Sequence, residues 1–136
     1  MNATPKRPFP RELHDVLLQA HQLYVATERK DGSRSAVAPI WFMYDGEAVY
    51  FTTAPGSWKA KRAARGGALH VRVGRKDGPY WKGTMTLERD PALAARMRPA
   101  YRRRYWIAWL GLFCPSPARV AAGRSLIVRV TPADGT

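Results

Sequence analysis

The strongest structural signal in the chain is the stretch FTTAPGSWKAKRAAR, residues Phe51–Arg65. Its first half continues an apolar strand pattern that ends on Thr52 and Thr53. A Pro-Gly pair then predicts a turn, after which Ser57 is placed to cap a short basic helix over residues 58–65. The stretch therefore predicts a strand, a tight turn and a helix in immediate succession.

The same stretch brings together groups that bind anions. Free backbone N–H groups at the start of a helix donate hydrogen bonds to phosphate, and hydroxyl and ammonium groups beside them add charge-assisted hydrogen bonds. Residues 56–76 hold seven basic residues and no acidic one. Two interpretations stay open on this pattern, a phosphate site and a solvated basic helix with ordinary capping. The groups concerned are Thr53, Ser57, Lys59, Lys61 and Arg62.

Predicted strands and turns surround this stretch on both sides. Hairpin turns with Asp-Gly at their centre separate several of the strands, and Pro39 marks an edge or a bulge because proline cannot donate to a strand ladder. The pattern predicts a mainly β fold with short helices (α+β), built as a six-stranded antiparallel barrel. The strands are expected at residues 22–29, 34–44, 48–53, 68–75, 80–88 and 124–131, and the other helices at 11–21, 90–101 (with Pro99 as a candidate break) and 105–113.

Composition narrows the class of protein. The 136 residues, 46% of them hydrophobic, suit a single domain over residues 1–136 with a loose N-terminal arm over residues 1–10. The 23 Lys and Arg exceed the 10 Asp and Glu, and the net charge of +13 suits an anionic partner. Residues 105–114 form the most apolar run, about half of a bilayer span. We therefore expect no membrane span and a cytoplasmic location.

Familiar catalytic signatures are missing from the sequence. It contains no Walker loop, no His-Glu-x-x-His and no Cys-x-x-Cys. The three histidines are spread along the chain, and His70 alternates with apolar residues as a structural strand residue does. Cys114, which is the one cysteine, excludes an intrachain disulfide and fits a buried, inert thiol. We therefore expect no metal site, and the catalytic residues stay unknown.

Three motifs in order carry a resemblance to a known family. The segment TTAPGSWKA, residues 52–60, resembles the flavin-phosphate segment of the pyridoxamine-5′-phosphate-oxidase-like split-barrel family. VAPIWF, residues 37–42, resembles that family's strand against the cofactor, and WKGT, residues 81–84, falls at its apolar-x-Gly-x-Ala strand. The resemblance covers residues 23–89 well. It implies a split barrel, a homodimer and an FMN cofactor that accepts hydride at N5.

The resemblance also implies roles for particular residues. Thr53 is expected to contact the phosphate or the ribityl chain, and Ser57 and Lys59 to hold the phosphate. Where the oxidase has Arg after the Ser, this chain has Trp58. The missing charge is therefore expected from Lys61 or Arg62. The remaining expected cofactor-binding residues are Ala38, Pro39, Ile40 and Trp41 along the isoalloxazine, together with Thr52 and Trp58.

Substrate and cofactor stay open at this point. The C-terminal strand keeps Arg129 and Pro132 but lacks the oxidase's fuller substrate-binding ending. The wider family includes deazaflavin-dependent reductases and haem-binding members, so a deazaflavin coenzyme on the same fold is the first alternative to FMN. The prediction is a flavin-dependent oxidoreductase of unknown small-molecule substrate.

A second basic region keeps another class of function open. Residues 91–133 contain eight arginines and no acidic residue, and the run Arg102–Arg104 abuts Tyr105 and Trp106. Arginine mixed with aromatic residues can bind single-stranded nucleic acid. An anionic substrate, an acidic membrane surface or a solvated basic face over a buried Trp pair would fit the same pattern. A non-enzymatic nucleic-acid-binding module is therefore the second alternative.

Overall fold

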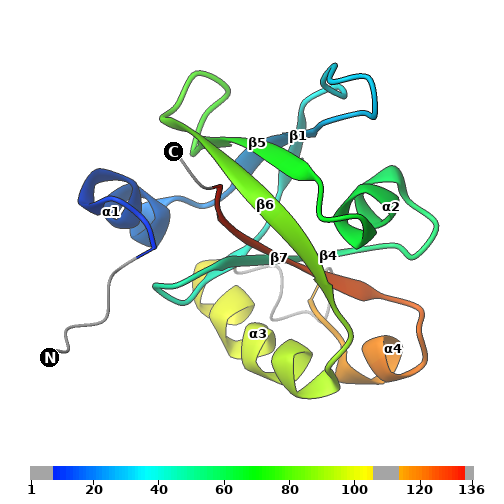
Figure 1. Cartoon of the computed structure of the whole chain (residues 1–136). Coiled ribbons are helices and arrows are strands. Elements are labelled where there is room, and N and C mark those ends of the chain that lie inside the picture. The colour runs from blue at the N-terminus through cyan, green and yellow to red at the C-terminus, as the bar shows by residue number, and fades with distance from the viewer. Residues whose placement is uncertain (1–7, 106–113, 134–136) are drawn as a thin grey trace, which may run out of the picture.

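The computed structural model describes residues 8–105 and 114–133. Within these residues the chain forms seven strands and four helices (Figure 1). The strands are β1 (Leu23–Thr27), β2 (Ala38–Ile40), β3 (Met43–Tyr44), β4 (Val49–Thr53), β5 (Ala68–Val73), β6 (Tyr80–Glu88) and β7 (Leu126–Pro132). The helices are α1 (Arg11–Gln19), α2 (Trp58–Ala64), α3 (Pro91–Arg104) and α4 (Pro117–Ala121).

The strands form one antiparallel sheet in the order β2-β1-β5-β6-β7-β4-β3. Only Trp41 and Phe42 separate β2 from β3 in the chain, yet these strands stand at opposite ends of that order. Since consecutive Cα atoms are about 3.8 Å apart, the two ends of the sheet lie within roughly 11 Å of each other. The sheet therefore curls into a split barrel, with its strands wrapped around a common interior (Figure 1). The predicted fold class is confirmed.

The predicted number of six strands is wrong, because the strand expected over residues 34–44 is interrupted. The hydroxyl of Tyr101 donates to the carbonyl of Trp41 at 3.0 Å, and the N–H of Phe42 donates to the hydroxyl of Tyr105 at 3.1 Å. The two tyrosine hydroxyls thus provide hydrogen-bond partners for backbone groups in the link between β2 and β3, where the chain crosses from one end of the sheet to the other. The interrupted segment becomes β2 and β3, which gives seven strands.

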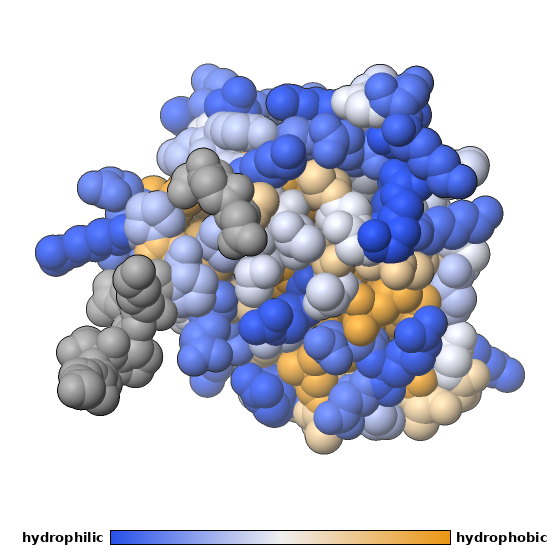
Figure 2. Space-filling view, viewed as in Figure 1, coloured by the Kyte–Doolittle hydropathy of each residue, from blue (hydrophilic) through white to orange (hydrophobic). Residues whose placement is uncertain are grey.

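Two apolar clusters lie on the two sides of the sheet. The barrel interior is filled by large side chains such as Trp81, Phe42 and Phe51, all at most 1% exposed. A second cluster, which includes Met97 and Tyr101, packs α3 against the outer face of β4 and β7. Figure 2 shows hydrophilic side chains over most of the face in view, with apolar side chains reaching the surface mainly in its lower half. The second cluster places α3 beside the interruption between β2 and β3.

The predicted helix starts are confirmed, while the candidate break at Pro99 is not observed. The Ser57 hydroxyl accepts from the N–H of Ala60 at 3.1 Å, and Asp90 caps α3 in the same way. α3 runs through Pro99 to Arg104, since Tyr101 anchors its second half. α4 was not predicted, and most of the helix expected over residues 105–113 lies outside the described residues.

The described end of the predicted N-terminal arm is held against the core. Phe9 is only 2% exposed, and its ring meets the rings of Trp81 and Tyr44 edge-on. Residues 1–7 lie outside the described part of the chain. In that described part, no helix is long and apolar enough to span a bilayer.

Candidate functional site

The turn between β4 and α2 brings the predicted hydroxyls together. The hydroxyl oxygens of Thr53 and Ser57 are 2.8 Å apart and share a hydrogen bond. The turn closes because the N–H of Ser57 donates to the carbonyl of Ala54 at 3.1 Å. Strand end, turn and cap therefore converge on one place, as the sequence predicts.

A cavity of about 560 Å³ opens beside this turn, and we call it the Lys59 cavity. Its wall combines three hydroxyl side chains with three cationic ones, and none of its lining residues is acidic. A dianionic group is the ligand that such a wall stabilises best. The lining residues are Thr27, Arg29, Ser35, Ala36, Ser57, Trp58, Lys59 and Arg62.

Arg62 is held rigidly in the wall of the Lys59 cavity. It is 8% exposed, and its Nη1 donates to the hydroxyl of Thr27 at 2.7 Å. The guanidinium also lies 4.9 Å from the ring centre of Trp58, which itself is 65% exposed. Lys61 contacts the same ring at 4.7 Å but does not line the cavity. Of the two cations that could replace the missing arginine, Arg62 is the one that faces the cavity.

A second cavity of about 890 Å³, the Trp41 cavity, lies along β2 and the end of β4. Five predicted site residues line it, whereas Ala38 lines neither cavity. Thr53 lines the Trp41 cavity and Ser57 the Lys59 cavity, so their hydrogen bond links the wall of one cavity to the wall of the other. The predicted residues in the Trp41 cavity are Pro39, Ile40, Trp41, Thr52 and Thr53, and the others are Ala54, Arg98, Tyr101, Cys114, Pro115, Ser116, Arg119, Arg124 and Ser125.

Two tyrosines hold Trp41 in place. The ring of Tyr105 stacks on that of Trp41 with centres 4.2 Å apart and planes inclined by 4°. Burial raises the pKa of Tyr101 well above its ordinary value, and burial also raises the pKa of Tyr105. Both hydroxyls are therefore protonated at neutral pH. Tyr101 can keep donating to the Trp41 carbonyl, and the wall of the cavity stays ordered.

Several arginines of the basic region make contacts within the fold. Arg96 pairs with Asp45 at 3.5 Å, and Arg98 donates to the carbonyl of Pro115 at 2.9 Å. Arg104 donates to carbonyls in the last turn of α1, among them that of Leu18 at 3.3 Å. These arginines stabilise the packing of α1, α3 and the segment before α4. Their engagement within the fold leaves fewer unengaged cations for a long polyanion.

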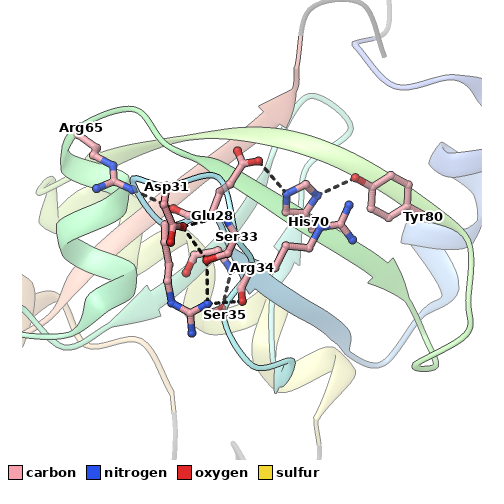
Figure 3. A network of polar contacts seen from close by, with 10 residues as sticks. Glu28, Asp31, Ser33, Arg34, Ser35, Arg65, His70 and Tyr80 are labelled. Carbon is pink, nitrogen blue, oxygen red and sulfur yellow. Dashed lines mark hydrogen bonds and ion pairs between the residues drawn. The ribbon is translucent and has the colours of Figure 1, made fainter.

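The histidine and cysteine predictions have different outcomes. His70 lies outside both cavities, where its Nδ1 shares a hydrogen bond with the Tyr80 hydroxyl at 2.7 Å and its Nε2 lies 3.7 Å from Glu28 (Figure 3). Burial, followed by the charge of Arg34, lowers the pKa of His70, so the ring is neutral at neutral pH. These contacts agree with the structural role predicted for His70, which stays a prediction. Cys114 is half-buried and lines the Trp41 cavity, so its predicted burial is only partial.

Sequence reasoning missed one side of each cavity. Thr27, Arg29 and Ser35 reach the Lys59 cavity from β1 and the loop after it, where no motif marks them. Arg119 and Arg124 reach the Trp41 cavity from α4 and the turn before β7. The signal for this second pair was present, because the acid-free run of arginines extends through both positions.

Comparisons with known proteins identify the family. The family model described as pyridoxamine 5'-phosphate oxidase matches residues 9–136. No curated protein sequence matches the chain. A solved structure called an F420 reductase shares 24% identity with a TM-score of 0.62, over 92% of this chain and 96% of that one.

Two further solved structures have the same fold. A putative pyridoxamine 5'-phosphate oxidase from Listeria innocua shares 16% identity with a TM-score of 0.64, over 90% of this chain and 92% of that one. A FAD and heme binding protein from Mycobacterium smegmatis shares 19% identity with a TM-score of 0.61, over 93% of this chain and 68% of that one. Together with the match over residues 9–136, this shows that the chain belongs to the pyridoxamine 5'-phosphate oxidase family.

Proposed function

We propose that this protein binds FMN and acts as a flavin-dependent oxidoreductase. One observation carries the proposal. The hydrogen bond between Thr53 and Ser57 links the wall of the Lys59 cavity, which carries hydroxyls and cations, to the wall of the Trp41 cavity, which is apolar and aromatic. A flavin mononucleotide has the same polarity, with a phosphate at one end and a flat ring at the other.

The Lys59 cavity fits the phosphate end. Lys59 and Arg62 supply positive charge, and Ser57 adds a hydroxyl at the start of α2. The lining residues include no carboxylate that would repel a phosphate. Arg62 already has its geometry set by Thr27, so little side-chain entropy is lost when an anion binds.

The Trp41 cavity fits the ring end. Pro39, Ile40 and Trp41 offer an apolar wall, and Thr52 and Thr53 offer hydroxyls at its edge. Bound FMN would supply hydride acceptance at its N5, while the protein binds the ring, orients it and limits the access of water. Tyr101, which lines the same cavity, stabilises this wall because its hydroxyl donates to the carbonyl of Trp41.

The test compares FMN with riboflavin, which lacks the phosphate. We expect the protein to bind FMN at least about tenfold more tightly than riboflavin, measured by quenching of flavin fluorescence, since the phosphate adds charge-assisted hydrogen bonds. Reduction of the bound flavin by a nicotinamide hydride donor, followed in the visible absorbance without oxygen, then tests the redox function. Equal affinity for the two flavins would contradict the assignment of the phosphate site.

A deazaflavin coenzyme is the second candidate for the same site. Its support is the solved structure called an F420 reductase, which matches over 96% of its length. Titration with F420 beside FMN separates the two candidates, because the tighter ligand under identical conditions identifies the cofactor. A nucleic-acid-binding module has weaker support, since Arg96, Arg98 and Arg104 are committed to contacts within the fold.

We also propose that two copies of the chain associate beside the Lys59 cavity. Trp58 and Val37 are 65% and 57% exposed, and Val37 follows Ala36 in the wall of that cavity. Burial of such side chains between two copies would remove apolar surface from water. Light scattering after size exclusion is expected to give twice the mass of 15.3 kDa. A monomer at micromolar concentration would contradict this proposal.

A further inference from the structure

The histidine ring on β5 has one buried nitrogen without a hydrogen bond. His70 is 7% exposed, and its Nε2 makes no hydrogen bond with any described residue. This nitrogen lies 3.7 Å from a carboxylate oxygen of Glu28, while Nδ1 shares a hydrogen bond with the Tyr80 hydroxyl (Figure 3). Such an atom calls for an explanation, because buried nitrogens in folded proteins nearly always have a partner.

Charged groups approach this ring from both neighbouring strands and from its own. Glu28 and Arg34 belong to the segment that follows β1, and Lys82 is the residue of β6 opposite the histidine in the sheet register. Arg72 stands two residues further along β5, with its guanidinium 5.0 Å from the centre of the tyrosine ring that holds Nδ1. Burial, followed by the charge of Arg34, lowers the pKa of His70, whereas Glu28 raises it. Glu28 is therefore the group that favours a proton on the ring.

The loop after β1 carries this carboxylate and part of the Lys59 cavity on adjacent residues. Thr27 and Ser35 both line the cavity, and two hydrogen bonds of 2.9 Å join them. The next pair along the loop, Glu28 and Arg34, forms an antiparallel bridge. Successive side chains of extended backbone point to opposite faces, so the first pair faces the cavity and the second faces the histidine. One step along the chain thus separates the anion site from the ring.

The charge of Glu28 opposes an anion in the Lys59 cavity. None of the lining residues is acidic, but Glu28 lies between Thr27 and Arg29 in the chain, and both of these line the cavity. Like charges repel each other across several ångströms of protein, because the protein screens them less than water does. Neutralisation of this carboxylate is therefore expected to strengthen the binding of an anion.

A proton on the ring provides this neutralisation. A protonated imidazole carries hydrogen on both nitrogens, so that Nδ1 donates to the Tyr80 hydroxyl and Nε2 faces the carboxylate of Glu28. A shift of about 1 Å turns the present separation into a charge-assisted hydrogen bond. The side chain of Glu28 is 31% exposed and has room for this shift. The buried nitrogen then gains the partner that it lacks.

We propose that His70 and Glu28 form a proton-linked control of the Lys59 cavity, in which a proton on His70 strengthens the binding of an anion there. This inference rests on the proposed function, which assigns the flavin phosphate to this cavity. Because coupling between two binding sites is reciprocal, an anion in the cavity also favours the proton on His70. The cavity then holds an anion of constant charge more firmly as the pH falls below about 6.5.

The experiment uses riboflavin 5′-sulfate, whose single negative charge stays constant between about pH 5.5 and pH 7.5, whereas the phosphate of FMN takes up a proton in this range. The ratio of its affinity to that of riboflavin, measured by fluorescence quenching, isolates the contribution of the anion. We expect this ratio to be about two- to fivefold higher at pH 5.5 than at pH 7.5 in the wild-type protein. In Glu28→Gln the ratio should already be high at pH 7.5, and in His70→Gln it should stay low at both pH values.

Two matched control variants leave the pair of His70 and Glu28 intact. Asp31→Asn removes a carboxylate from the same loop, where hydrogen bonds from Ser33 lower the pKa of Asp31 and keep its charge constant in this range. His21→Gln removes an exposed histidine that lines neither cavity. Both variants are expected to keep the rise of the ratio toward low pH. Thermal unfolding verifies that each variant is folded.

Proton NMR adds a measurement that does not depend on flavin binding. The ring signals of His70 give its pKa in sulfate and in chloride at equal ionic strength. We expect sulfate to raise this pKa in the wild-type protein and to leave it unchanged in Lys59→Ala. Without sulfate, Glu28→Gln should lower the pKa further, because the ring loses the charge that favours its proton.

Two results would overturn the inference. The first is an affinity ratio that does not rise toward low pH in the wild-type protein. The second is a rise that survives in Glu28→Gln or in His70→Gln, which would assign it to other titrating groups. Failure of the wild-type protein to bind either flavin would instead contradict the proposed function. The NMR titration then decides, since equal pKa values of His70 in sulfate and in chloride would overturn the coupling.

Discussion

The Lys59 cavity and the Trp41 cavity hold their cations in different ways. Arg62 in the Lys59 cavity is buried, donates to Thr27 and packs on Trp58. Arg119 and Arg124 in the Trp41 cavity are exposed and have no partner among the described residues. A side chain fixed in advance suits a ligand of constant structure, whereas free side chains can adjust to ligands that differ in shape. The fixed cation of the Lys59 cavity thus suits a group of constant structure, whereas the two arginines of the Trp41 cavity can adjust to ligands that vary.

The largest expected effect comes from removing the fixed cation. Arg62→Ala is expected to weaken FMN binding by about thirtyfold or more and to lower the free energy of unfolding by about 1–3 kcal/mol, because the buried hydroxyl of Thr27 loses its partner. Fluorescence titration measures the first effect and urea unfolding the second. Unchanged FMN affinity would show that Arg62 serves stability alone, and the comparison between the cavities would fail.

Lys59→Ala tests the same cavity without disturbing the core. FMN affinity is expected to fall at least about tenfold, from loss of a contact of about 1.5–3 kcal/mol, while riboflavin affinity stays the same. The matched control is Lys61→Ala, which removes an equal charge from the same helix outside the cavity. If both variants bind FMN equally well, Lys59 does not hold the phosphate.

Ser57 combines a structural role with a binding role, and two variants separate them. Ser57→Ala is expected to lower the free energy of unfolding by about 1 kcal/mol through loss of the helix cap. Ser57→Asp keeps a capping oxygen but adds a negative charge, so it should keep the stability and weaken FMN binding further. Urea unfolding and FMN titration of both variants provide the check. Retained FMN affinity in Ser57→Asp would place the phosphate elsewhere.

A smaller effect is expected from pH on the free energy of unfolding. It comes from His70, which lines neither cavity. Because burial and Arg34 lower the pKa of His70 below 6.5, the unfolded chain binds this proton more readily than the folded one. Stability is therefore lost as the pH falls from about 6.5 toward the folded pKa. Glu28 opposes the effect, and Lys82 adds to it. Urea unfolding across this range should show a weaker pH dependence for His70→Gln, and identical slopes would contradict the assignment.

The smallest expected effect is at Arg103. This exposed residue lies on α3 and lines neither the Lys59 cavity nor the Trp41 cavity. Arg103→Ala is therefore expected to change FMN affinity by less than about twofold, since exposed charges at a distance are screened by salt. A large loss in the fluorescence titration would mean that the basic region as a whole, rather than chosen positions in it, contributes to binding.

The local parts of the fold were predictable from sequence, because turns and caps act between neighbours. Ser57 and Asp90 cap the helices that their positions predict. The interruption after Ile40 was not predictable, since it depends on a hydrogen bond between the N–H of Phe42 and Tyr105, 63 residues away. No local pattern at residues 34–44 encodes that contact.

The candidate site likewise has one part that the local sequence predicts and another that depends on residues far apart in the chain. Thr53, Ser57 and Lys59 belong to one short segment with a recognisable pattern, and the structure brings them to one turn. Thr27 and Arg124 come from distant strands and turns, and only the folded chain places them beside that segment. The run of arginines without acidic residues indicated a basic surface. The sequence alone could not show which of these arginines make contacts within the fold.

The contact between α3 and the peptide bond joining Trp41 to Phe42 also affects how the protein is made. Tyr101 and Tyr105 act as a clasp on the seam of the barrel, and both leave the ribosome after β1 to β6 have been synthesised. Until then the nascent sheet has an open seam, with unpaired edges available to other chains. Because β7 pairs with both β6 and β4 and is synthesised later still, chaperone dependence during translation should end only once β7 has followed the two tyrosines, and amide exchange at Phe42 should report release of the clasp.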